Sequence, residues 1–331
     1  MPPNAPDWRA LAHDVLAGKR LGEAEALAVL TSPDDELLDV LAGAFILRRA
    51  AFGREVRLHL IRNARSGGCG EDCGFCAQSR ESTETVPEHP LQSADEILAG
   101  AHEAARLGAV RYCIVTSGRH TTPADLDSLC AAVRAVKRET SLEVCTSLGL
   151  LDENLARQLK AAGVDRYNHN LETSKRFFPE VCSTHDYEDR VETARVVKRA
   201  GLALCSGGII GMGETLEDRV ALAFAAAEVK ADSVPVNFFD PRPGTPFGDR
   251  PRPAAADGLR ALAMFRFVCP AAEVRAAGGR EACLGPLQAL ALFPANSIFV
   301  DGYLTTSGQG HADDLAMIRA AGFEPGSLVQ G

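Results

Sequence analysis

The chain has 331 residues, 46% of them hydrophobic, which is enough for one large core. Its formal net charge of −9 argues against a nucleic-acid partner, because phosphate backbones demand a basic face. The N-terminus lacks the basic start and apolar run of a signal peptide, and no stretch approaches the ~20 apolar residues needed to cross a bilayer. These features predict a cytoplasmic protein with no membrane partner, whose ten cysteines stay reduced and serve metal or catalytic roles.

The first part of the chain, residues 1–54, has a helical pattern. Apolar residues recur with a period near 3.6 at Leu11 and Val15, and again at Leu37 and Leu41. No chemistry-bearing motif lies in this segment, so it is predicted to be an N-terminal helical cap packed against the rest.

From residue 55 to 331, short β-rich runs alternate with helical stretches such as Ala94–Leu107 and Pro123–Lys137. Strict alternation predicts a parallel sheet, and eight repeats predict a (βα)8 TIM-type barrel with its active site at the carboxyl ends of the strands. An open doubly wound sheet is the alternative. Pro241–Pro253 is predicted to be a long loop after the sixth strand. The predicted strands begin near Val56, Arg111, Leu142, Asp165, Ala203, Ser233, Glu273 and Ser297.

A cysteine triplet, C-x-x-x-C-x-x-C, follows the first predicted strand at Cys69, Cys73 and Cys76. With ten cysteines in 331 residues, this spacing would occur by chance about 0.01 times. Three thiolates on a glycine-rich loop can wrap one soft metal centre. An iron–sulfur cubane usually takes four cysteines, so three would leave one iron open to another ligand. A structural zinc site with a distant fourth ligand is the alternative.

A second set of side chains is spread over four predicted strands. Cys113, Cys145, Cys205 and Arg275 fall on the second, third, fifth and seventh strands. A single strand cysteine is usually a small core residue, but inward residues of a closed barrel meet at one level and could enclose a second cluster. The other cysteines outside the triplet have no partner pattern and are predicted to be core or incidental surface thiols: Cys130, Cys182, Cys269 and Cys283.

The triplet, with an aromatic residue before its last cysteine, resembles the motif of radical S-adenosylmethionine (SAM) enzymes. The resemblance implies that Cys69, Cys73 and Cys76 hold a 4Fe–4S cluster. Its open iron would bind the amino and carboxylate groups of SAM, and one electron would cleave SAM to methionine and a 5′-deoxyadenosyl radical. The backbone of Phe75 would lie near the adenine.

Over about residues 55–325 the chain resembles the biotin synthase family within this superfamily. The matching runs are Y-N-H-N-L-E-T at 167–173, C-S-G-G-I-I-G-M-G-E-T at 205–215, S-V-P-V-N at 233–237 and A-N-S-I-F at 295–299. The resemblance implies conversion of dethiobiotin to biotin. An auxiliary 2Fe–2S cluster would donate the sulfur, held by the four strand residues Cys113, Cys145, Cys205 and Arg275.

Two positions depart from that family. After Cys113 the chain reads I-V-T-S-G-R, where well-known members carry a stretch like M-G-A-A-W. Because this change lies beside the auxiliary site, it leaves open whether that cluster is 2Fe–2S or larger. Glu172 replaces an aspartate, which keeps a carboxylate for ribose hydroxyls but places it one methylene farther out.

Polar residues alternate on the fourth predicted strand at Asn168, Asn170 and Glu172, so their side chains share a face. The resemblance assigns Asn170 and Glu172 to the SAM ribose, and Asn168 with Asn237 to the ureido ring of dethiobiotin. Amides and a carboxylate suit these hydrogen bonds. His169 would point the other way and is read as structural. A solvated strand end is the alternative for this polar set.

Two further residues are assigned to SAM. Arg190 resembles the family arginine that binds the SAM carboxylate, a task suited to paired guanidinium donors, although its helical setting also suits a surface salt bridge. Ile210 lies in the glycine-rich run 207–211, which would let a cofactor ring lie against the backbone.

The resemblance also implies partners. An external one-electron donor, a flavodoxin or ferredoxin, is expected because the sequence shows no electron-transfer domain, and the family is commonly homodimeric. The alternatives are a related radical SAM enzyme, similar to a hydrogenase maturase or a methylornithine synthase, and a non-catalytic zinc-binding protein.

Overall fold

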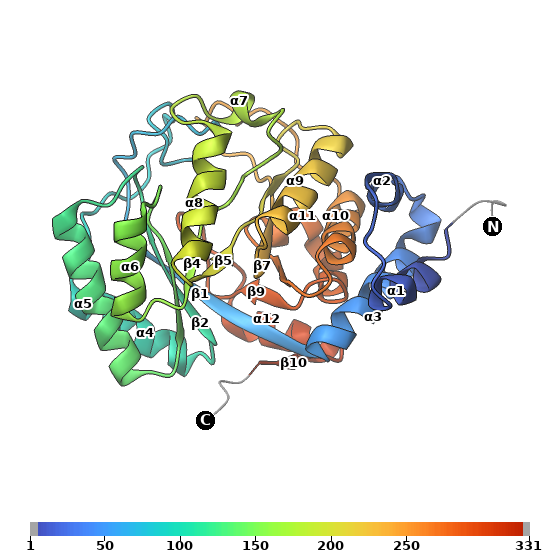
Figure 1. Cartoon of the computed structure of the whole chain (residues 1–331), viewed down its shortest axis with the longest axis horizontal. Helices are drawn as coiled ribbons and strands as arrows, with labels where there is room; N and C mark the ends of the chain where they lie inside the picture. Colours follow the sequence, from blue (N-terminus) through green and yellow to red (C-terminus); the bar gives the residue numbers. More distant parts are fainter. Residues whose placement is uncertain (1–5, 327–331) are drawn as a thin grey trace.

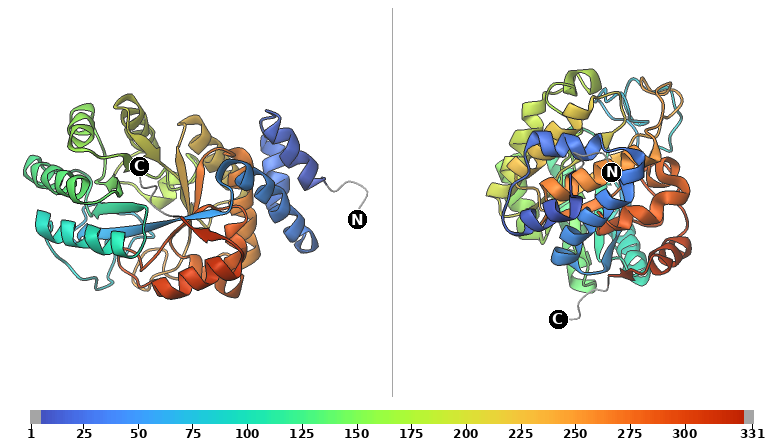
Figure 2. Two further views of the ribbon diagram at one scale, coloured as in Figure 1. Left: turned by 90° about the horizontal axis from the view of Figure 1, so that it is seen from below. Right: turned by 90° about the vertical axis from the view of Figure 1, so that its right-hand side faces the viewer.

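A computed structural model describes residues 6–326. The N-terminal segment forms three helices that lie together on one side of the molecule (Figures 1 and 2) and pack against α9 (Leu216–Glu228) and α10 (Ala255–Val268). The side chain of Asp7 caps the first of them by accepting from the backbone nitrogens of the first turn. The three helices are α1 (Trp8–Leu16), α2 (Glu23–Leu30) and α3 (Leu37–Phe52), with a short 3-10 turn, η1 (Asp34–Glu36), before α3.

The predicted barrel is confirmed. Eight parallel strands pair in chain order, and the pairing of the first with the last closes the sheet, so the open-sheet alternative is wrong. The barrel strands are β1 (Glu55–Arg65), β2 (Arg111–Thr116), β3 (Glu143–Ser147), β4 (Arg166–Asn168), β5 (Ala203–Cys205), β7 (Ser233–Phe238), β8 (Glu273–Ala276) and β9 (Ser297–Phe299). Each begins at or next to its predicted position. Two short strands were not predicted: β6 (Gly208–Ile210), which pairs with β7, and β10 (Glu324–Pro325), which pairs with β1.

Helices surround the sheet and start where the sequence supplies caps. Ser93 and Glu96 form a capping box at α4, and Thr122 caps α5 just before Pro123. The predicted loop at 241–253 lies between β7 and α10. The remaining helices are α4 (Ala94–Arg106), α5 (Pro123–Glu139), α6 (Glu153–Ala162), α7 (Phe178–Val181), α8 (Tyr187–Arg199), α11 (Arg280–Leu284), η2 (Gly285–Leu292) and α12 (His311–Ala320).

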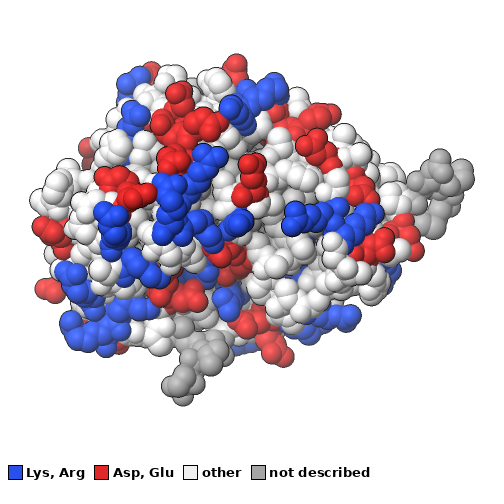
Figure 3. All heavy atoms as spheres, in the orientation of Figure 1, with Lys and Arg blue, Asp and Glu red and all other residues white. Residues whose placement is uncertain are grey.

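On the face shown in Figure 3, acidic and basic side chains are interspersed, so neither charge dominates that face. Within residues 6–326, no helix is both long enough and apolar enough to cross a membrane. The cysteine loop follows β1 directly and, with α7, lies at the top of Figure 1, at the carboxyl ends of the strands. This is the end of a (βα)8 barrel where active sites form.

Candidate active site

The cysteine loop is anchored to two distant segments. Its three thiols at Cys69, Cys73 and Cys76 are half-buried and line one cavity. In the middle of the loop, the Gly74 nitrogen donates to the Val181 carbonyl at 2.9 Å, and the Gly74 carbonyl accepts from the Phe247 nitrogen at 3.0 Å. A Cβ at position 74 would lie 2.6 Å from the Phe247 ring, so any larger residue there would displace that ring. Backbone hydrogen bonds to both segments therefore define the path of the loop.

Two acidic residues inside the loop, Glu71 and Asp72, hold the segment 182–185. Asp72 accepts from the backbone nitrogens of Ser183 at 3.0 Å and Thr184 at 3.2 Å, and also from the Ser183 hydroxyl. Burial alone would raise the pKa of Asp72, but the hydrogen bonds from Ser183 hold it well below its usual range. Sequence analysis missed this contact because the partners lie about 110 positions apart and share no motif.

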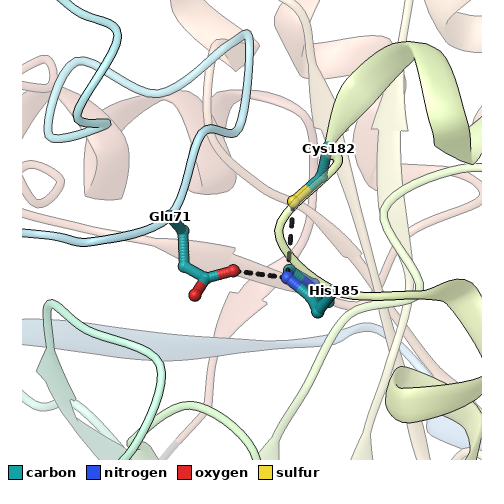
Figure 4. Close-up of side chains that lie close together, drawn as sticks. All are labelled: Glu71, Cys182 and His185. Atoms are coloured by element: carbon teal, nitrogen blue, oxygen red, sulfur yellow. Dashed lines mark hydrogen bonds and ion pairs between the residues drawn. The ribbon is translucent and has the colours of Figure 1, made fainter.

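Cys182 lies at the centre of this contact (Figure 4). Its sulfur is 3.1 Å from Asp72 Oδ1 and 3.3 Å from His185 Nδ1, and His185 Nδ1 is in turn 2.5 Å from Glu71 Oε2. The ligand atoms of Glu71, Cys182 and His185 lie within 4.8 Å of one another, which is metal-site spacing, although hydrogen bonds also account for the arrangement. Cys182, predicted to be a core or incidental surface thiol, is buried, and its proximity, with burial, raises the pKa of Cys73.

The thiols that line the cavity are those of Cys69, Cys73 and Cys76. Cys182 packs into the hydrophobic core and is not part of the cavity wall. Burial raises the pKa of Cys76 to about 11, and the neighbouring Cys69 adds to the effect. A bound cationic metal centre would relieve that penalty, since thiolates are the metal-binding form. The donor set thus suits an iron–sulfur cubane with one iron open towards the cavity.

Four of the five residues assigned to SAM, Phe75, Asn170, Glu172 and Arg190, line the same cavity. Arg190 is buried, which excludes the surface salt bridge; its Nη1 donates to the Asn170 carbonyl at 2.9 Å and lies 3.4 Å from Glu172 Oε1. Asn170 Nδ2 lies 3.5 Å from the other oxygen of Glu172. Burial raises the pKa of Glu172, and Arg190 opposes that shift. The structure therefore brings these three predicted residues together.

The path of the chain here differs from the prediction of one long strand. β4 ends at Asn168, and Glu172 has a left-handed φ of 67°, which is uncommon for a residue other than glycine. Asn168 and Glu172 still face the cavity, but His169 also lies along its wall, although it was expected to point away. A Cβ at Gly208 would lie 2.3 Å from the Glu172 carbonyl, so this glycine permits close approach of two chain segments.

The strand set converges inside the barrel, as predicted. Cys113 and Cys145 are register partners on β2 and β3, and the neighbouring Cys113 thiol, together with burial, raises the pKa of Cys145. Arg275 Nη1 lies 3.7 Å from the Cys205 sulfur. All four side chains are buried, and Arg275 Nε has no hydrogen-bond partner among the described residues. The three thiols and this unpaired guanidinium nitrogen suit an anionic cluster.

A buried charge network that was not predicted supports Arg275. Glu273 accepts from Arg275 Nη2 at 2.9 Å and from Arg111 Nη1 at 2.7 Å, and the Arg111 guanidinium also lies 3.0 Å from His59 Nε2. Burial would raise the pKa of Glu273, but the surrounding cations, Arg111 first, hold it well below its usual range. This network fixes the plane of the Arg275 guanidinium.

The cysteine triplet lines one cavity, and Cys113, Cys145 and Arg275 line a second cavity that shares walls with it, including Phe75, Asn168 and Glu172. Asn237 lines the second cavity, where its Nδ2 donates to the Gly208 carbonyl at 3.1 Å and its Oδ1 accepts from the Gly278 nitrogen at 2.9 Å. Ile210 is fully buried in the core, and its neighbour Ile209 faces the second cavity instead. The contact of Ile210 with SAM stays a prediction, and it would be made by the Ile210 backbone.

Comparison with known proteins places this site in a family. Residues 64–226 match the Radical SAM superfamily model, and residues 235–324 match the Biotin and Thiamin Synthesis associated domain. The biotin synthase of Salinibacter ruber is 51% identical over 324 residues, which cover 98% of this chain and 90% of that protein. The biotin synthase of Halalkalibacterium halodurans is 48% identical over 324 residues, covering 98% and 97%.

Solved structures share the fold at much lower identity. A methylornithine synthase structure has a TM-score of 0.83 at 18% identity, covering 96% of this chain and 98% of that one. The FeFe-hydrogenase maturase HydG from Carboxydothermus hydrogenoformans has a TM-score of 0.82 at 16% identity, covering 96% and 79%. These similarities show the barrel alone, and neither alternative enzyme nor a zinc-binding protein is favoured over the near full-length relatives. The chain belongs to the biotin synthase family of radical SAM enzymes, which insert sulfur with the help of a 4Fe–4S cluster and SAM.

Proposed function

We propose that this protein converts dethiobiotin to biotin by radical sulfur insertion. The observation that carries the proposal is the pair of cysteine sets, one at the mouth of the barrel and one inside it, on cavities with common walls. A substrate lying between them would reach both a SAM-derived radical and a sulfur source. Nearly full-length similarity to biotin synthases supports the same reaction.

At the mouth, Cys69, Cys73 and Cys76 hold the 4Fe–4S cluster. When bound and reduced, that cluster supplies the electron that cleaves SAM into methionine and the radical that takes hydrogen from the substrate. Arg190 holds the SAM carboxylate by charge-assisted hydrogen bonds.

Other residues complete the SAM site. Asn170 and Glu172 bind the ribose hydroxyls, and the 3.5 Å spacing of their side chains would let both reach one diol. The backbone of Phe75 and of Ile210 lies against the adenine.

Inside the barrel, Cys113, Cys145, Cys205 and Arg275 hold the auxiliary cluster, which is 2Fe–2S or larger and donates the sulfur. Burial of all four side chains supports this role, since a sacrificed sulfide must be protected until the substrate arrives. Arg275 donates a hydrogen bond to Glu273, which keeps its positively charged guanidinium in a fixed position beside the cluster.

Substrate and partners follow from the same proposal. Asn168 and Asn237 lie near the ureido ring of dethiobiotin; because both polar atoms of Asn237 already bond the backbone, its contact would use a remaining amide hydrogen or lone pair. The electron comes from an external flavodoxin or ferredoxin. We further propose a cytoplasmic homodimer with a helical cap at 1–54 and a catalytic barrel at 55–331.

The test is an assay of the anaerobically reconstituted chain with SAM, a reductant and dethiobiotin. We expect biotin together with 5′-deoxyadenosine, identified by mass spectrometry. Cleavage of SAM without any thiolated product would favour another radical SAM reaction, and zinc without iron or acid-labile sulfide would contradict both.

A further inference from the structure

Four nitrogens of residues that line the SAM cavity have no hydrogen-bond partner among the described residues: Nε of Arg119, Nε2 of His169, Nε2 of His185 and Nε of Arg190. Of these residues, His185 and Arg190 both pack against the Phe178 ring. The side chain of His185 is only 4% exposed. A buried donor or acceptor without a partner carries a desolvation penalty, so such atoms in a native site indicate a missing partner.

The orientation of His185 is fixed from the opposite side of the ring. Its Nδ1 lies 2.5 Å from Glu71 Oε2, and the Thr184 hydroxyl donates to the same carboxylate oxygen at 2.6 Å. Figure 4 shows the Glu71 carboxylate and the Cys182 sulfur approaching this one nitrogen. Because Nδ1 is engaged, Nε2 is the only ring nitrogen left for a ligand in the cavity.

Phe178 places His185 beside Arg190. The Phe178 ring meets the His185 ring edge to face at 5.6 Å between centroids, and the Arg190 guanidinium lies 5.5 Å from the same Phe178 ring. Nη1 of Arg190 donates a hydrogen bond to the Asn170 carbonyl. His185 and the Arg190 guanidinium, of which only part is hydrogen-bonded, therefore border the same cavity.

We infer that His185 binds the carboxylate of the methionine end of SAM, together with Arg190. The inference rests on the proposed binding of SAM and adds to it a residue that no sequence motif indicated. A carboxylate on each side of the imidazole lets both ring nitrogens donate, one to Glu71 and one to SAM. Glu71 acts as the positioning residue, since it sets the direction of Nε2.

The chain offers two variants that separate this role from a structural one. His185→Asn places an amide nitrogen near the position of Nδ1, so it can still contact Glu71 but has no group at the position of Nε2. His185→Gln reaches the position of Nε2 with an amide donor but loses the contact with Glu71. An exposed histidine on α4, in His102→Gln, is the matched control.

The experiment measures the Kd of SAM and of decarboxylated SAM by equilibrium dialysis on reconstituted protein, after iron and sulfide have been counted. We expect His185→Asn to weaken SAM binding about tenfold or more, as for a lost charge-assisted hydrogen bond, and to leave decarboxylated SAM nearly unchanged. His185→Gln should recover part of the SAM affinity, and His102→Gln should match the wild type.

Three results would overturn the inference. SAM could bind the Asn variant as tightly as the wild type, both ligands could weaken equally, or the Asn variant could lose its iron, which would assign His185 to the loop alone. Failure of the wild-type chain to bind iron or SAM would instead overturn the proposed function, so the two failures are distinguishable.

Discussion

The two cysteine sets differ in what holds them in place. Cys113 and Cys145 sit opposite each other in the β2–β3 ladder, where strand register alone fixes their spacing. Cys73 lies on a loop whose position depends on hydrogen bonds to segments more than 100 residues away. The comparison indicates that the auxiliary site is built by the fold, whereas the SAM site is built by a few polar contacts that single substitutions can remove.

The largest expected effect separates the two sets by activity. Cys73→Ala should abolish both SAM cleavage and biotin formation, because the remaining two loop thiols cannot hold the cubane. Cys145→Ala should abolish biotin formation while SAM cleavage continues. Quantifying 5′-deoxyadenosine and biotin in the same reactions checks this division, and equal loss of both products in the two variants would refute it.

The next prediction concerns how much the buried charge network stabilises the barrel. Glu273→Gln leaves the fully buried Arg111 and Arg275 without their shared anion, and breaking a buried ion pair costs about 3–5 kcal/mol. We expect a loss of this size in the free energy of unfolding, measured by chemical denaturation. Glu103→Gln, at an exposed pair on α4, is the control and should be nearly neutral. A neutral Glu273 variant would show that the interior network does not stabilise the barrel.

A smaller effect is expected at the loop anchor. Asp72→Asn weakens several hydrogen bonds from Ser183 and Thr184, which should lower the free energy of unfolding by about 1–3 kcal/mol and reduce the iron bound per chain. The auxiliary cluster should be unaffected, because its ligands lie on strands. Asp127→Asn, an exposed acid on α5, is the control. Full iron loading in the Asp72 variant would contradict the proposed dependence on the anchor.

The same anchor predicts a pH dependence. The pKa of Asp72 is held below its unfolded value, chiefly by Ser183 against the effect of burial. Its stabilising contribution is therefore complete above the unfolded pKa of about 4 and declines as the pH falls below it. Denaturation of wild type and Asp72→Asn at pH 7 and at lower pH should show their difference shrinking towards acid. A difference that stayed constant would point to a cause other than ionisation.

The same contrast explains what could be predicted from the sequence. Strand positions follow from local alternation, so the barrel and the inward direction of Cys113 and Cys145 were predictable. The contact between Asp72 and Ser183 depends on tertiary packing across the barrel mouth and leaves no local pattern. For Cys182 the sequence left a core thiol and a surface thiol both open, and its position beside Cys73 could not be derived from spacing.

The central claim is that Cys69, Cys73 and Cys76 form the site of a 4Fe–4S cluster. Its most direct test is the iron and acid-labile sulfide content of the anaerobically purified chain, compared with a variant carrying alanine at all three positions. We predict that the variant holds about four fewer irons per chain and retains the iron of the auxiliary site. Equal iron in the two proteins, or zinc in place of iron in the wild type, would contradict the account.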